Sequence, residues 1–156
     1  MSGARAVAAA VLDPELRAVT IEDLGVLRDV SVDGPTGRVT VTVTPTYSGC
    51  PAMDMIRTDI GRALASAGYP DVAVVTSLAP AWTTDWITPV GRAKLAAAGI
   101  APPARSGGPV PVTLTVRCPN CGSPDTEELS RFGSTACKAL RRCRACAEPF
   151  DQIKTL

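Results

Sequence analysis

Four of the six cysteines form two pairs with the spacing of metal ligands. The pairs are Cys118-x2-Cys121 and Cys143-x2-Cys146, and 21 residues lie between them. Each pair can form a tight turn whose backbone amides point at the thiolates, and Gly122 supplies the dihedral freedom that such a turn needs. Two such turns brought together place four sulfurs in a tetrahedron. The spacing therefore predicts a closed four-thiolate metal site.

Zinc, as a structural ion, is the metal that we favour for this site. Four thiolates also suit iron, and Cys118-Pro-Asn-Cys-Gly122 is as typical of a rubredoxin knuckle as of a zinc ribbon. Two disulfides would need an oxidising compartment, which nothing at the N-terminus indicates. A thiol oxidoreductase is the other alternative, but its redox pair normally occurs once, at a helix start, whereas two pairs occur here in a short strand-rich segment.

Cys50 lies where the sequence Thr46-Tyr-Ser-Gly-Cys-Pro51 leads from a predicted strand into a predicted helix. With Pro51 as the first helical residue, Cys50 would be the N-cap, where unpaired amides and the positive end of the helix dipole favour a thiolate. Such a thiol can react or bind metal. The alternative is a small, buried and inert cysteine, because free cysteine is among the most buried residue types.

The sixth cysteine, Cys137, lies six residues before Cys143, which is a poor spacing for a two-residue knuckle. We predict that it is a structural, non-ligating residue near the metal site. Exchange with Cys143 as a metal ligand and a redox role are the alternatives.

The composition excludes several classes of function. The chain has 156 residues and no histidine, which excludes Ser-His-Asp and Cys-His catalysis, histidine-ligated haem and mixed Cys/His zinc fingers. Its 16 basic and 15 acidic residues leave almost no net charge to select a partner. No Walker loop or Rossmann glycine fingerprint occurs, so we expect no enzyme activity. Neither a signal peptide nor an apolar stretch of the roughly 20 residues of a membrane helix is evident, so we expect a cytoplasmic protein.

The first hundred residues predict an α+β domain. Two segments rich in β-branched residues flank turn-forming residues 33–37 and suit a hairpin. Apolar residues then recur at helical spacing from Met53 until Gly68, a plausible stop. We expect a small mixed sheet with helices packed on one side. The expected elements are a helix at 4–12, strands at 26–32 and 38–44, a helix at 53–68, a strand at 71–78 and a helix at 89–98.

A linker is predicted to join two domains. Residues 101–111 concentrate proline, glycine and small residues without a periodic apolar pattern. We therefore assign residues 1–100 to the α+β domain and residues 112–156 to a β-rich, four-cysteine zinc ribbon. A segment of about 45 residues is close to the size below which a core alone rarely suffices, so metal should supply much of its folding free energy.

The two tryptophans, Trp82 and Trp86, are four residues apart. We expect them to pack, or to dock a client protein, rather than to bind a cofactor. An exposed pair would mark a client-binding surface.

Several motifs resemble known families. Asp13-Pro14-Glu15, Thr20-Ile-Glu-Asp-Leu-Gly25 and Thr46-x-x-Gly49-Cys50-Pro51 are similar to the metal-sulfur cluster assembly domain of SufT-like proteins. Three further segments resemble the PaaD family of phenylacetate-degradation proteins. They are Pro80-Ala-Trp-Thr-Thr-Asp-Trp-Ile-Thr, Gly91-Arg-Ala-Lys-Leu, and Phe132-Gly-Ser-Thr-Ala-Cys-Lys138 with Cys143-x2-Cys146-x-Glu148-Pro149-Phe150. Together these motifs cover nearly the whole chain.

The resemblance implies an accessory protein of the bacterial phenylacetyl-CoA epoxidase. That system is a multicomponent di-iron monooxygenase with a separate reductase that carries flavin and a 2Fe-2S cluster. The resemblance further implies that the chain helps to mature a metal centre of the system rather than catalyse the epoxidation. Its client would be a reductase or oxygenase subunit, and its cargo a transient iron ion or iron-sulfur cluster.

The same resemblance assigns residues to roles. It places the reactive cysteine at Cys50, the acidic motif at Asp13, Glu15 and Asp23, and the ribbon ligands at Cys118, Cys121, Cys143 and Cys146. Asp13 could instead end the first helix, and Asp23 could cap the next turn.

One cysteine is too few for a cluster, since clusters usually take four ligands. A second copy of the chain, a nearby carboxylate or cysteines of the client would have to complete the shell around Cys50. Homodimerisation is therefore one hypothesis.

A cluster of basic residues lies on the predicted ribbon: Arg131, Lys138, Arg141, Arg142 and Arg144. Such a patch can bind phosphate backbones, so the alternative function is a nucleic-acid-binding or protein-docking adaptor without cluster transfer. The near-zero net charge and the shortage of aromatic residues for base stacking argue against nucleic acid.

Overall fold

The computed structural model describes residues 2–104 and 115–155. The chain divides into two compact units, Met1–Gly91 and Arg92–Leu156, and each is described by itself. In the described part of the chain, no helix has both the length and the apolar character needed to cross a membrane.

The division of the chain differs from the expected boundary at residue 100, because it falls after Gly91. Ala101, which was expected to open the linker, lies in the short strand β4 (Ile100–Ala101) and pairs with Gln152. Ala101 belongs to a strand because its backbone pairs with a strand about 50 residues later in the chain, and local composition does not indicate such pairing. The predicted linker from residue 105 onward lies outside the described residues.

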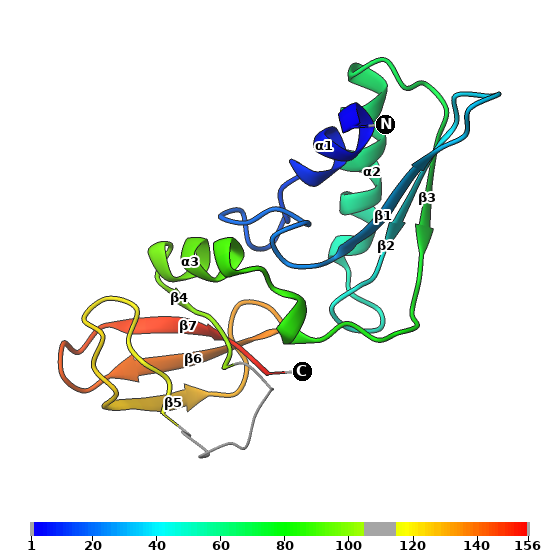
Figure 1. Cartoon of the computed structure of the whole chain (residues 1–156). Helices are drawn as coiled ribbons and strands as arrows, with labels where there is room; N and C mark the ends of the chain where they lie inside the picture. The colour runs from blue at the N-terminus through cyan, green and yellow to red at the C-terminus, as the bar shows by residue number, and fades with distance from the viewer. Residues whose placement is uncertain (1, 105–114, 156) are drawn as a thin grey trace. The chain divides into compact units, whose positions relative to one another are not determined.

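The first unit contains a three-stranded mixed sheet with two helices on one of its faces (Figure 1). Strands β1 (Leu27–Val32) and β2 (Val39–Val43) form the predicted antiparallel hairpin. Strand β3 (Val72–Thr76) runs parallel to β2, because α2 (Ala52–Ser66) carries the chain back between them. Helix α1 (Ser2–Ala9) precedes the sheet. The expected fold class and order of elements are confirmed.

The core of this unit follows from two periodicities. Val39, Val41 and Val43 alternate with threonines along β2 and are fully buried on one face of the sheet. Ile56 and Ile60, one helical turn apart on α2, are buried as well. Burying each side chain of this size contributes about 1.5–3 kcal/mol, so the packed face stabilises the strand-to-helix turn that carries Cys50.

The segment after β3 packs against the turn at Thr20–Gly25. The indole Nε1 of Trp82 donates to the Leu24 carbonyl oxygen at 2.8 Å, and Trp82 is buried. Trp86 ends a short 3-10 helix, η1 (Thr84–Trp86), and its ring lies 3.7 Å from the guanidinium carbon of Arg28. We expected the tryptophans either to pack or to dock a client protein, and buried Trp82 packs within this unit.

The second unit contains a four-stranded sheet in the order β4-β7-β6-β5. Strands β5 (Thr126–Ser130), β6 (Lys138–Cys143) and β7 (Pro149–Ile153) are antiparallel neighbours, and β4 lies parallel to β7. Helix α3 (Pro89–Ala97) begins just before this unit. A small core joins Ala101 and Phe150 to two cysteines, Cys118 and Cys143. The predicted β-rich character is confirmed.

Replacing Gly25 by alanine should destabilise the first unit strongly. Gly25 has φ +73°, and a Cβ there would lie 2.6 Å from the Cβ of Trp86. The left-handed backbone and the overlap together should lower the free energy of unfolding by roughly 3 kcal/mol or more. Tryptophan fluorescence during urea unfolding reports this unit, because both tryptophans lie in it.

Gly37→Ala is the matched control, since Gly37 has φ +71° but open space where its Cβ would lie. It should cost only about 1 kcal/mol. Equal losses in the two variants would show that the approach of Trp86 to Gly25 is not a tight constraint.

Candidate metal centre and cysteine site

The four paired cysteines converge as the spacing predicted. Their Sγ atoms all lie within 4.8 Å of one another. The Cys118 and Cys146 sulfurs are 3.8 Å apart, and those of Cys121 and Cys143 are 3.6 Å apart. A tetrahedron with zinc–sulfur bonds of ~2.3 Å has edges of ~3.8 Å. The donor set and its spacing therefore fit a four-thiolate metal ion.

Backbone amides of the two turns point at the thiolates. The Asn120 amide lies 3.4 Å from the Cys118 sulfur, and the Cys146 amide lies 3.5 Å from the Cys143 sulfur. The Cys146 N–H, helped by that of Ala145, lowers the pKa of Cys143 to about 7 against the effect of burial. The pKa of Cys121 and that of Cys146 are raised instead, so the amides of the turn favour the thiolate, the form that binds metal, at Cys143 in particular.

The two knuckles differ in the residue after the second cysteine. Gly122 follows Cys121 and has φ +76°, as predicted. The corresponding residue after Cys146 is Ala147, which has φ 65° and is the one positive-φ residue other than glycine in the described chain. An alanine in the left-handed region is strained, because its Cβ crowds the backbone.

Cys137 lies outside this group of sulfurs. It precedes β6, whereas Cys143 ends that strand, so six residues of extended chain place the two about 20 Å apart. The prediction that Cys137 lies near the metal site is therefore wrong, and this separation disfavours an exchange of ligands. Its half-buried sulfur contacts the Thr135 hydroxyl at 3.1 Å.

Cys50 lies one residue earlier relative to α2 than predicted. Pro51 is the N-cap and Ala52 the first residue of the helix. Pro51 already has helical dihedral angles, φ −68° and ψ −20°, so the difference is within the usual variation in where a helix begins. The Cys50 amide donates to the Tyr47 carbonyl at 3.3 Å and closes the turn before the helix.

Opposing influences act on the thiol of Cys50, and together they raise its pKa above the ordinary value. Partial burial is the largest influence and raises the pKa. The N–H of Ala52 lowers it, as expected at a helix start, and so does a hydrogen bond from Tyr47. The carboxylates of Glu15 and Asp13 raise it. Cys50 is therefore half-buried, and its surroundings together disfavour the thiolate, although the helix-start amide acts in the expected direction.

The structure brings Asp13 and Glu15 into the electrostatic environment of Cys50. Asp13 is buried, and its Oδ1 accepts hydrogen bonds from the backbone of Glu15 at 2.9 Å and Leu16 at 2.7 Å. This Asx turn both begins the 13–16 segment and fixes the carboxylate. Asp13 therefore both forms this turn and acts electrostatically on the Cys50 thiol.

Asp23 forms a reciprocal cap with Thr20. Its Oδ2 accepts from the Thr20 amide at 2.9 Å, and its own amide donates to the Thr20 hydroxyl at 3.1 Å. The capping role, one of the two that the sequence left open, is thus present. Tyr47 was not among the predicted site residues, because only the folded turn shows that its side chain reaches Cys50.

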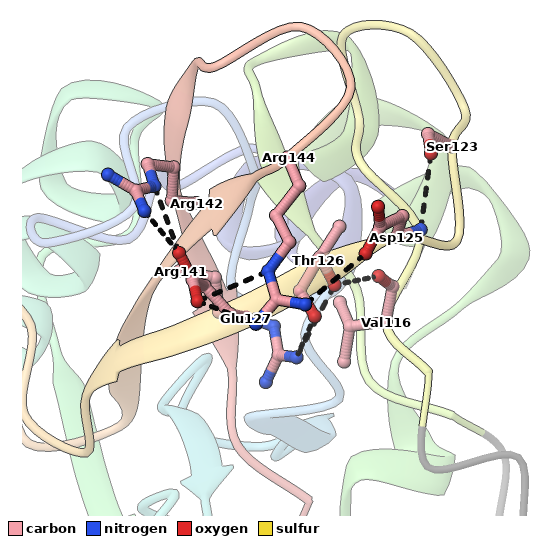
Figure 2. A network of polar contacts seen from close by, with 8 residues as sticks. All are labelled: Val116, Ser123, Asp125, Thr126, Glu127, Arg141, Arg142 and Arg144. Carbon is pink, nitrogen blue, oxygen red and sulfur yellow. Dashed lines mark hydrogen bonds and ion pairs between the residues drawn. The ribbon is translucent and has the colours of Figure 1, made fainter.

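The basic cluster on the ribbon is largely neutralised (Figure 2). Glu127 accepts from Arg144 Nη2 at 2.9 Å and from Arg142 Nε at 3.1 Å, and these guanidinium groups lower the pKa of Glu127. Further ion pairs join Arg144 to Asp125 and Lys138 to Asp151, whereas the Glu128 carboxylate lies 3.9 Å from Arg141, the longest of these contacts. Because four of the five predicted patch residues have acidic partners, this face is a poor site for a phosphate backbone.

Comparison with known proteins places this architecture in a family. A model of the PaaD zinc beta ribbon domain matches residues 103–154, and a model of an iron-sulfur cluster assembly protein matches residues 5–76. A protein of Escherichia coli strain K12, named as a putative subunit of 1,2-phenylacetyl-CoA epoxidase, is 49% identical over 144 residues. That alignment covers 92% of this chain and 86% of the relative. The chain belongs to the PaaD family.

Other relatives match part of this PaaD-family chain. An Fe-S protein maturation auxiliary factor of Porphyromonas gingivalis is 38% identical over 79 residues, which cover 50% of this chain and 73% of the relative. A domain of unknown function, DUF59, from Bacillus anthracis is similar in structure, with a TM-score of 0.55, 28% identity, and coverage of 60% of this chain and 89% of that one. A conserved hypothetical protein of Thermotoga maritima gives a TM-score of 0.50 at 28% identity, with coverage of 60% and 91%.

Ala147→Gly should slow metal loss from the tetrad. Glycine relieves the left-handed strain at the second knuckle, which should stabilise the loaded site by about 0.5–1 kcal/mol and reduce the rate of zinc release to a chromophoric chelator roughly two- to fivefold. Gly122→Ala, the reverse change at the first knuckle, should accelerate release. Faster release from Ala147→Gly would contradict this account.

Glu15→Gln should make Cys50 more reactive. Removing the negative charge lowers the raised pKa of the thiol, so more thiolate is present at a given pH, and iodoacetamide should alkylate Cys50 about twofold faster at mildly alkaline pH. Tyr47→Phe should act in the opposite direction, because it removes a hydrogen bond that lowers the pKa. Peptide mass spectrometry of zinc-loaded protein measures the rate.

The control for this measurement is Glu22→Gln, which removes an exposed carboxylate paired with Arg5. The control should leave alkylation of Cys50 unchanged. Unchanged or slower alkylation in Glu15→Gln would refute the proximity of the Glu15 carboxylate.

Proposed function

We propose that this chain is an accessory maturation factor that helps to assemble or deliver an iron or iron-sulfur centre to a multicomponent phenylacetyl-CoA epoxidase, and that it is not itself an enzyme. An assembly-type domain joined to a PaaD ribbon supports the accessory maturation role. The epoxidase as destination comes from the name of the relative that is 49% identical.

The observation that carries the proposal is the contrast between two kinds of cysteine site. The tetrad is a closed set of four sulfurs, which holds a metal ion permanently, and we propose zinc as that ion. Cys50 is not a member of the tetrad; it lies at the start of a helix, and the Glu15 and Asp13 carboxylates act on it electrostatically. A single thiol in this setting suits a metal that is handed on.

The raised pKa of Cys50 also suits transfer. A metal ion must displace the proton of the thiol before it binds, so a raised pKa weakens the hold of the sulfur on its cargo. When the cargo leaves for a site with more ligands, the proton returns to Sγ. Partial burial, the largest cause of the raised pKa, therefore favours return of the proton, whereas the two negative carboxylates attract a metal cation as well as a proton.

Cys50 needs ligands from outside its own surroundings. Among the residues that the structure describes, only the tetrad forms a group of three or more metal-binding side chains. The remaining ligands of an iron ion or cluster at Cys50 would come from a second copy of the chain or from the client. We propose a reductase or oxygenase subunit as the client, with a homodimer as the form that holds cargo before transfer.

Metal and acid-labile sulfide analysis of anaerobically purified protein tests this function. Wild type should hold about one zinc per chain and additional iron with an absorption band in the visible range. Cys50→Ser should keep the zinc and lose the iron, because the transfer ligand is gone.

Cys137→Ser is the matched control, since it removes a half-buried cysteine outside the tetrad, and it should keep both metals. If wild type and Cys50→Ser hold only zinc and behave alike, cluster transfer through Cys50 is refuted. If Cys50→Ser keeps its iron and Cys137→Ser loses it, the iron is held by Cys137, and the assignment to Cys50 is refuted.

A further inference from the structure

The second unit contains a pocket of about 420 Å³ beside strands β6 and β7. Its volume lies in the range of small-molecule binding sites. Apolar side chains, including Pro102, Pro103 and Val116, form part of its lining. Two positive residues, Arg117 and Arg141, are also in the lining. The pocket therefore combines apolar walls with cationic groups.

Arg141 is a largely buried cation in this pocket, and its hydrogen bonds are long. Its side chain is only 11% exposed, yet the Thr126 hydroxyl lies 3.3 Å from its Nη2 atom. The Gln152 side-chain oxygen lies 3.5 Å from Nη1, and the Glu128 carboxylate lies 3.9 Å away. The Nε atom is buried without a hydrogen-bond partner. Figure 2 shows the guanidinium reaching from β6 toward Thr126.

The neighbouring arginines make a sharp contrast (Figure 2). The side chains of Arg142 and Arg144 are 51% and 57% exposed, and both bind Glu127 closely. A buried charge needs a close counter-ion more than an exposed one does, because burial removes it from water. Here the exposed arginines share a close carboxylate, whereas largely buried Arg141 has hydrogen bonds of 3.3–3.5 Å to neutral groups, the Thr126 carbonyl included, and its carboxylate lies at 3.9 Å. This inversion makes Arg141 a site suited to an anion.

We propose that this pocket binds a small carboxylate that carries an apolar body. The carboxylate is planar and matches the fork of the Arg141 guanidinium, so it can accept two parallel hydrogen bonds. Arg117 adds a second positive charge at the rim, and Glu128, which is 43% exposed, can turn to solvent when the ligand displaces its distant contact. The apolar body packs against Pro102, Pro103 and Val116.

The test is an NMR titration of the full, zinc-loaded, nitrogen-15-labelled chain with benzoate, with neutral benzamide and acetate as comparisons. Benzoate should cause saturable shifts at the amides of Val116, Arg141 and Gln152. Benzamide, which has the ring without the charge, should bind at least about tenfold more weakly, because a charge-assisted hydrogen bond is lost. Acetate should also bind more weakly, because it lacks the ring. Absence of saturable shifts with benzoate, or equal binding of either comparison compound, overturns the proposal.

Two variants locate the binding group. Arg141→Lys keeps the charge but loses the planar fork, and it should weaken benzoate binding about tenfold. Arg142→Lys makes the same change on the same strand outside the pocket and should leave binding unchanged. Equal effects of the two variants would overturn the assignment to Arg141. The wild-type comparison of benzoate with benzamide decides the matter even if Arg141→Lys does not fold.

Discussion

The mutual repulsion of four sulfurs that lie within 4.8 Å is the constraint on which the second unit depends. Four thiolates at this distance cannot all be ionised without a cation between them, and the cation in turn ties the turn before β5 to the turn after β6. Cys118 and Cys143 are also core residues beside Phe150, so the same bonds organise the small sheet. The ion pairs on β5 and β6 and the pocket beside β7 rest on that sheet.

One residue type serves opposite purposes in the two units. Around Cys143, backbone N–H groups lower the pKa and prepare the thiolate for metal. Around Cys50, burial and the nearby carboxylates outweigh the helix-start amide and keep the thiol protonated. The two sites differ in the number of ligands and in electrostatics, although the ligand atom is the same. Four sulfurs complete the coordination of an ion, whereas a single sulfur supplies only one of its ligands. Under the function that we propose, permanent and transient metal binding would coexist in one chain.

Charge on the ribbon is arranged by strand pairing. Antiparallel pairing places Glu127 opposite Arg142 and Glu128 opposite Arg141. Glu127 pairs closely with Arg142 and Arg144, whereas the Glu128 carboxylate stays 3.9 Å from Arg141. The exposed pairs contribute little to stability, because water screens them. Their effect is on recognition, since they remove the positive patch that would attract a phosphate backbone. Arg141 is left as a largely buried β6 cation whose carboxylate partner lies 3.9 Å away.

The sequence by itself determined the features with a local cause. The two cysteine pairs, the alternating valines of β2 and the glycine of the first knuckle each follow from spacing or backbone freedom within a few residues. Only the tertiary structure decided that the Glu15 carboxylate acts on Cys50, that Cys137 is a strand's length from the tetrad, and that the Arg141 side chain is largely buried. These depend on which strands pair and in what register. Residues far apart in the chain meet only after long-range packing has fixed the sheet, and no local pattern encodes that outcome.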